Sequence, residues 1–143
     1  MSVSIGSSQV LAAEPELILG LVRSGTERAF GAGDLLLRQG DASTSLFYIL
    51  SGRVAVELSS GDLNRPVTLA ELGDGELLGE MGVLDGKPRS ASARAVEPTR
   101  AIEIGGDRAL EALARTPDVA LRVMKMLAER LRAADDLAAQ ARP

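Results

Sequence analysis

The sequence predicts a mainly β domain with flanking helices, of the α+β class, because the pattern of apolar residues changes twice along the chain. Between residues 28 and 104, short apolar segments alternate with breaks that contain glycine. Such strands, with a turn signal about every 8–12 residues, are typical of a β-sandwich or a small barrel. On both sides of this region the apolar residues recur at helical spacing. The 143 residues suit one domain, which we expect to span about 14–143 after a loosely ordered stretch at 1–13.

Six segments of the β region are expected to form strands, because each is a short apolar run bounded by turn residues. They are Leu35–Arg38, Leu46–Leu50, Val54–Leu58, Val67–Leu72, Ser90–Val96 and Arg100–Ile104. Ahead of them, the apolar run after Glu14-Pro15-Glu16 suits a short helix with carboxylates at its positive end. After them, Arg108–Arg115 predicts one helix, and Thr116-Pro117-Asp118 predicts the start of another that reaches Gln140. The C-terminal helices should therefore cover about 106–140.

Composition and charge exclude several classes of function. Histidine and cysteine are both absent, so the chain can form no Ser-His or Cys-His pair, no imidazole-based metal site and no disulfide. The net charge of −4 gives no overall basic field for nucleic acid, and no apolar stretch approaches the ~20 residues of a membrane span. The N-terminus lacks the features of a signal peptide. We therefore expect a cytoplasmic, non-catalytic protein with no catalytic cofactor or metal, which binds neither nucleic acid nor membrane.

The segment most informative about chemistry is residues 77–92, which interrupts the strand pattern. It can form about one helical turn that starts at Gly79, where free backbone N–H groups attract an anion. Gly79 and Gly82 allow a ligand to approach the backbone closely. A turn then brings back Arg89, whose planar cationic fork suits phosphate oxygens, with the hydroxyl of Ser90 beside it.

Glu80 needs its own explanation, because a carboxylate repels a phosphate. The pairing of Glu80 with Arg89 makes sense if Glu80 accepts a hydrogen bond from a hydroxyl of the same ligand. A ribose 2′-OH beside a singly charged cyclic phosphate has that combination of donor and anion. Taken alone, a glutamate and an arginine at this spacing are more often a surface ion pair of little energetic value.

The same segment resembles the phosphate-binding cassette of cyclic-nucleotide-binding domains, whose pattern is close to F/L-G-E-x-A/G-L followed, after a short turn, by P-R-S/A/T-A. The matching residues here are Leu78-Gly79-Glu80-Met81-Gly82 and Pro88-Arg89-Ser90-Ala91. The resemblance covers roughly residues 26–135, since Phe30–Asp34 and Leu46–Gly52 also look like the family's opening strands and turns. It implies a jelly-roll barrel with an N-terminal helix, a short cassette helix and two C-terminal helices.

The resemblance also implies the roles of individual residues. Glu80 matches the family's ribose-binding glutamate, and Arg89 matches its phosphate-binding arginine. The other positions that the family places around the ligand are Gly79, Met81, Gly82 and Ser90 in the cassette, Val56, Leu69 and Leu78 on the pocket wall, and Arg130 on the last helix. Val56, Leu69 and Leu78 are expected to be core residues first and pocket residues second.

By this resemblance the chain is a stand-alone sensor that binds a cyclic nucleotide, with cAMP ahead of cGMP, and Ser90 is compatible with both. Ligand binding would move the C-terminal helix and signal to an unidentified effector protein or to a second copy in a homodimer. The bacterial catabolite activator protein continues into a DNA-binding helix-turn-helix, whereas this chain ends at Pro143, so no nucleic acid partner is expected. Two alternatives remain open, namely a jelly-roll interaction domain that has lost its ligand and a cupin-type metalloenzyme, although the latter class usually relies on imidazoles.

Overall fold

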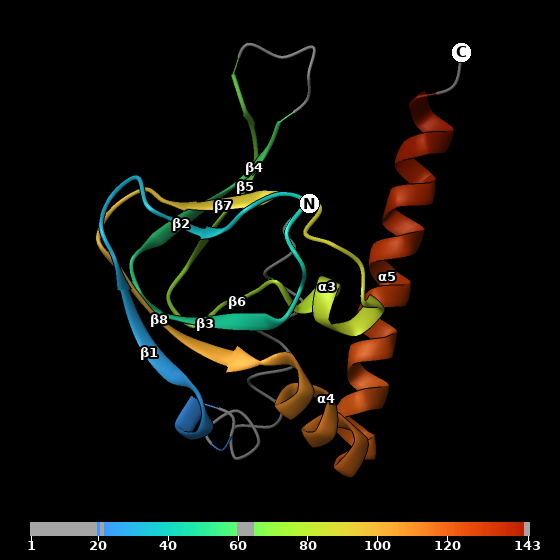
Figure 1. The fold of residues 1–143 in the computed structure, drawn as a ribbon. Coiled ribbons are helices and arrows are strands. Elements are labelled where there is room, and N and C mark those ends of the chain that lie inside the picture. Colours follow the sequence, from blue (N-terminus) through green and yellow to red (C-terminus); the bar gives the residue numbers. More distant parts are fainter. Residues whose placement is uncertain (1–19, 21, 60–64, 142–143) are drawn as a thin grey trace.

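The body of the protein, in a computed structural model that describes residues 20, 22–59 and 65–141, consists of two antiparallel four-stranded sheets. The strands are β1 (Thr26–Phe30), β2 (Leu35–Leu37), β3 (Ser45–Ser51), β4 (Arg53–Leu58), β5 (Val67–Gly73), β6 (Leu77–Leu78), β7 (Ser92–Ala95) and β8 (Thr99–Gly105), and the helices are α3 (Glu80–Asp85), α4 (Gly106–Arg115) and α5 (Pro117–Ala141). One sheet has the order β1-β8-β3-β6 and the other β2-β7-β4-β5. In Figure 1 the sheets form a barrel, and α5 runs along one side of it.

This architecture confirms the predicted fold class, a mainly β jelly-roll with flanking helices. It also contains two strands that the sequence pattern did not predict, β1 and the two-residue β6, which pairs with β3. β1 pairs with β8 along its whole length. Four of its five residues are exposed and two of these are charged, so β1 has no apolar run that could reveal it. Most of the helix expected after Glu14 lies outside the described residues. Of the described residues in this region, 20 and 22–24 are helical.

The strand expected at Ser90–Val96 is shorter in the structure, where β7 begins only at Ser92. The backbone around Arg89 pairs with the turn between β2 and β3 instead of with a strand. The Arg89 N–H donates to the Asp41 carbonyl at 2.8 Å, and the Gly40 N–H donates to the Arg89 carbonyl at 2.9 Å. Arg89 is therefore fixed at the entrance to β7 by contacts with a distant turn.

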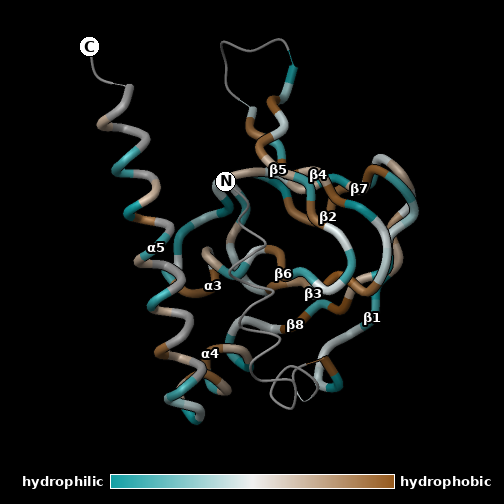
Figure 2. Tube along the Cα trace, turned by 180° about the vertical axis from the view of Figure 1, so that it is seen from behind, coloured by the Kyte–Doolittle hydropathy of each residue, from teal (hydrophilic) through white to brown (hydrophobic). Residues whose placement is uncertain are grey.

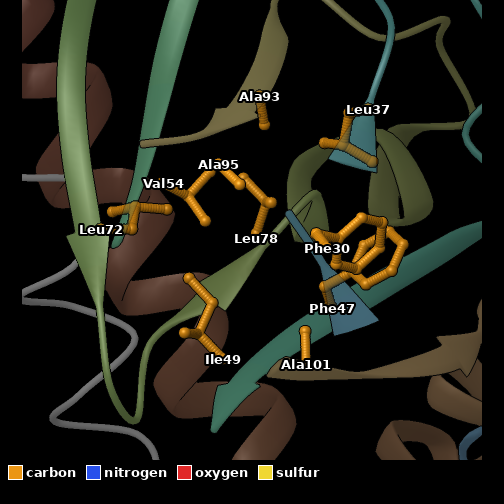
Figure 3. Packing of buried hydrophobic residues seen from close by; sticks show 10 residues of the cluster. All are labelled: Phe30, Leu37, Phe47, Ile49, Val54, Leu72, Leu78, Ala93, Ala95 and Ala101. Carbon is orange, nitrogen blue, oxygen red and sulfur yellow. The ribbon is translucent and has the colours of Figure 1, made fainter. Parts of the chain in front are cut away.

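The main core lies between the two sheets and contains both phenylalanines of the chain (Figure 3). Phe30 and Phe47 pack edge to face, with 6.0 Å between the ring centroids. The other side chains of this core are aliphatic: Leu37, Ile49, Val54, Leu72, Leu78, Ala93, Ala95 and Ala101. Leu78 of this core is the last residue of β6 and stands two residues before the start of α3, so the core adjoins the cassette region.

The helices at the C-terminal end differ in how they pack. α4 begins at Gly106, the first residue of the range expected for the C-terminal helices and two residues before the predicted segment Arg108–Arg115. It buries Ala109 against the outer face of the β1-β8-β3-β6 sheet, in a second core with Leu46, Val83 and Ile104. α5 begins at Pro117, as the Thr116-Pro117-Asp118 signal predicted. It follows the barrel past α3, and in Figure 2 polar and apolar residues alternate along it. Across the described residues, none of the helices combines the length and the apolar character needed to cross a membrane.

Candidate functional site

A cavity of about 460 Å³ opens between α3, the turn that follows it and strands β4, β5 and β7. Its volume lies in the range of roughly 300–1,000 Å³ that is usual for small-molecule sites. Nine of the ten residues predicted from the sequence line it: Val56, Leu69, Leu78, Gly79, Glu80, Met81, Gly82, Arg89 and Ser90. The tenth, Arg130, belongs to α5, and its side chain lies outside the described residues. The cavity thus brings together residues of β4 and β5 with residues of the segment 78–90, and their roles toward a ligand stay predictions.

Gly79 shapes the cavity by making room for Arg89. It precedes α3 in the left-handed conformation, with φ +85°, which residues with a side chain rarely adopt. A Cβ atom at this position would lie 2.7 Å from Nη1 of Arg89 and 3.4 Å from a methyl carbon of Leu37. The left-handed backbone and the close approach of Arg89 therefore both require glycine at position 79, whether or not a ligand is bound.

Gly82 is required for a second close approach within the cassette. A Cβ atom there would overlap the hydroxyl and the Cβ of Ser43. The Ser43 hydroxyl in turn donates a hydrogen bond of 2.6 Å to the carbonyl of Lys87, in the turn that leads back to Arg89. Both glycines therefore serve the packing of the cassette itself, in addition to the ligand approach predicted for them.

Arg89 is a buried cation with two neutral acceptors. Only 8% of the residue is exposed. Its Nη1 donates to the Gly79 carbonyl at 3.1 Å and its Nη2 to the Ser45 carbonyl at 2.6 Å. Burial lowers the pKa of the guanidinium, an effect that the charges of Glu103 and Asp41 partly offset. Because an arginine remains protonated at neutral pH, Arg89 presents a fixed positive charge with further N–H donors to the cavity.

Glu80 is the buried carboxylate of the same cavity. It is 8% exposed and is the first residue of α3, directly after Gly79. A carboxylate in the first turn of a helix is favoured by the positive end of the helix dipole. A cation and an anion of the protein therefore line one cavity, which suits a ligand that carries both an anionic group and a hydroxyl donor.

The remaining wall is largely apolar. Leu78 belongs to the main core and Val56 packs against it, as predicted for residues that serve the core first. Leu69, by contrast, is 56% exposed on β5, and Met81 is also exposed, so these two form an apolar rim. Ser90 is exposed at the same rim. Sequence reasoning did not predict the further lining residues Leu37, Ser43, Ala70, Leu72, Leu77, Asp85, Lys87, Pro88, Ala91, Ser92 and Ala93.

The match to a family model decides which family this fold belongs to. The model described as the cyclic nucleotide-binding domain matches residues 27–116, which is more than half of the chain. The chain belongs to this family. The cyclic nucleotide-binding domain extends through all eight strands, α3 and α4, apart from the first residue of β1.

Similar proteins carry this domain as part of longer chains. The Cyclic AMP receptor protein of Thermus thermophilus is 41% identical over 109 residues, which are 76% of this chain and 50% of that protein. The crystal structure of the Catabolite Activator Protein of the same organism has a TM-score of 0.76 and 37% identity, covering 87% of this chain and 60% of that one. Glutaminase 2 of Bradyrhizobium diazoefficiens is 35% identical over 89% of this chain and 20% of its own length. The chain thus spans between a fifth and about half of the length of these curated relatives.

Proposed function

We propose that the chain binds a cyclic nucleotide, with cAMP as the preferred ligand, in the cavity between α3 and strands β4, β5 and β7. The observation that carries this proposal is that the buried cation of Arg89 and the buried carboxylate of Glu80 line one cavity with a mostly apolar wall. Arg89 donates hydrogen bonds to the cyclic phosphate through N–H groups not used by the two backbone carbonyls. Glu80 accepts a hydrogen bond from the ribose 2′-OH.

The proposal of cAMP over cGMP is supported by the similarity to a relative that is named for cyclic AMP. Ser90, the residue whose hydroxyl is compatible with either base, is exposed at the cavity rim. The competing hypothesis for the same site is therefore cGMP or another cyclic nucleotide, and the two are separated by titrating the protein with each ligand.

The domain acts as a regulatory module without catalysis of its own. Within the described residues, no three His, Cys, Asp or Glu side chains are grouped so that they could hold a metal ion, so nothing there favours the cupin-type alternative. The signal passes through α5, which carries exposed apolar residues such as Met124 and Leu131. Ligand binding draws this helix toward the apolar rim, provided that the ligand prefers the closed arrangement. An effector protein, or a second copy of the chain, then contacts the changed surface, and we place the protein in the cytoplasm.

The test is a calorimetric titration with cAMP of the wild type, of Arg89→Lys and of a matched control, Arg94→Lys. Arg94 is also a β7-region arginine that binds a backbone carbonyl, that of Gly33 at 2.7 Å, but it does not line the cavity. Arg89→Lys replaces the planar guanidinium, which can donate two parallel hydrogen bonds to a phosphate, by a compact ammonium group. It should weaken cAMP binding at least about tenfold, which corresponds to about 1.4 kcal/mol. Arg94→Lys should bind as the wild type does. Equal affinity of all three proteins would refute the role of Arg89, and absence of binding to the wild type would refute the function.

A further inference from the structure

A chain of hydrogen bonds connects Arg89 to the outer edge of the barrel. The Ser45 carbonyl accepts from Arg89 at 2.6 Å, and the Ser45 hydroxyl donates to Oε2 of Glu103 at 2.7 Å. The other carboxylate oxygen of Glu103, Oε1, accepts from Nη1 of Arg28 at 2.8 Å. The Arg28–Glu103–Ser45 chain crosses β1, β8 and β3. At its inner end the buried residue Ser45 is hydrogen-bonded to Arg89, the cation of the proposed phosphate site.

The charges along this chain alternate, and Glu103 lies between two arginines. Burial by itself raises the pKa of Glu103, but the hydrogen bonds from Ser45 and Arg28 and the charges of Arg28 and Arg89 outweigh it, so the pKa is lowered. Glu103 is therefore ionised at neutral pH. Its side chain is about one-third exposed and also lines a second cavity, of about 500 Å³, so its field is reduced by solvent but not removed.

We propose that Glu103 is an affinity-determining counter-ion of Arg89, and that Arg28 controls how much of the Glu103 charge Arg89 experiences. This inference rests on the proposed function. A cyclic phosphate brings a further negative charge to Arg89, on which the charges of Glu103 and Asp41 already act. Glu103 and the phosphate are attracted by the same cation and repel each other, so the charge of Glu103 weakens phosphate binding. Arg28 relieves this competition by pairing with Glu103.

The two ends of the chain therefore predict opposite effects on affinity. Glu103→Gln keeps the shape of the side chain and removes its charge, so cAMP should bind about three- to tenfold more tightly. Arg28→Gln leaves the Glu103 charge without its partner, so cAMP should bind more weakly by a similar factor of about three to ten. A variant that merely disturbs the structure would weaken binding in both cases, so the opposite signs separate a charge effect from a structural one.

Matched controls come from the neighbouring ion pair across the same two strands. Glu27 and Arg100 pair at 2.8 Å between β1 and β8, are both exposed, and line neither cavity. Glu27→Gln and Arg100→Gln make the same chemical changes and should leave the affinity for cAMP unchanged.

The salt concentration gives a further test of the charge effect. Raising it should reduce the increase in cAMP affinity that Glu103→Gln produces, because ions screen partly exposed charges.

The outcomes distinguish this inference from the proposed function. If the wild type does not bind cAMP, the proposed function fails. If the wild type binds but Glu103→Gln and Arg28→Gln shift the affinity in the same direction, or leave it unchanged, the counter-ion role is overturned and the function stands. Thermal unfolding of each variant verifies that it is folded. If Glu103→Gln does not fold, Arg28→Gln is compared with Arg28→Lys, which keeps a positive charge near Glu103. Weaker binding in Arg28→Gln than in Arg28→Lys supports the inference, and equal affinity of the two variants overturns it.

Discussion

Replacing Gly79 by alanine probes the geometry of the site most sharply, because two independent costs coincide at this position. The residue has φ +85°, and placing a residue with a side chain in the left-handed region costs about 1–2 kcal/mol. The new Cβ would also lie 2.7 Å from Nη1 of Arg89, which is closer than any ordinary contact. The guanidinium must move and give up its 3.1 Å hydrogen bond to the Gly79 carbonyl, and a charged hydrogen bond contributes about 1.5–3 kcal/mol.

Together these costs lower the free energy of unfolding of Gly79→Ala by about 2.5–5 kcal/mol, and the displaced guanidinium lowers the affinity for cAMP at least about tenfold. Gly33→Ala is the matched control, because Gly33 has a similar φ of +93° but no atom within 4 Å of the position of a Cβ. In Gly33→Ala the free energy of unfolding should fall only by the backbone cost of about 1–2 kcal/mol, and the affinity for cAMP should equal that of the wild type. Urea unfolding and calorimetric titration measure both quantities. Equal losses of stability in the two variants, with affinity retained in Gly79→Ala, would refute the reasoning.

Three further predictions concern the ligand, the acid sensitivity and the last helix. The 2′-deoxy analogue of cAMP should lose the hydrogen bond to Glu80, a difference of about 1.5–3 kcal/mol, and equal affinity for both ligands would show that Glu80 does not bind the ribose. Because the pKa of Glu103 is lowered in the folded protein, its contribution to stability is present above the ordinary glutamate pKa of about 4.3 and is lost as pH falls through the folded value. The difference in unfolding free energy between wild type and Glu103→Gln should accordingly fall on acidification from pH 7 to pH 3, and a constant difference would contradict the pairing. If α5 mediates a homodimer, Leu131→Glu, at a residue that is 64% exposed, should convert dimers to monomers in sedimentation experiments, whereas an unchanged dimer would exclude this face of the helix.

Features that depend on neighbouring residues in the chain could be predicted from the sequence. The start of α5 at Pro117 follows from the local capping preferences of Thr116, Pro117 and Asp118. The cassette helix after Gly79 follows from the glycine and from the apolar residues around it. Glu80 and Arg89 line the same cavity, which agrees with the expectation that the short turn between them folds the segment back on itself.

Features that arise from pairing between distant strands could not be predicted in the same way. β1 is exposed along most of its length, so its strand character comes from β8 and not from its own apolar pattern. The contact of Arg89 with Ser45 involves a backbone carbonyl, which every residue type provides, so it leaves no signature in the sequence. Glu103 is connected to Arg89 through Ser45, and nothing in its alternating strand distinguishes it from a solvent-facing glutamate.

A crystal structure of the chain grown with cAMP tests the central claim most directly. The account predicts one cyclic nucleotide in the cavity of about 460 Å³, with its phosphate oxygens within hydrogen-bonding distance of the Arg89 guanidinium and its ribose 2′-OH on the carboxylate of Glu80. An empty cavity at saturating cAMP, or a nucleotide bound elsewhere on the protein, would contradict it.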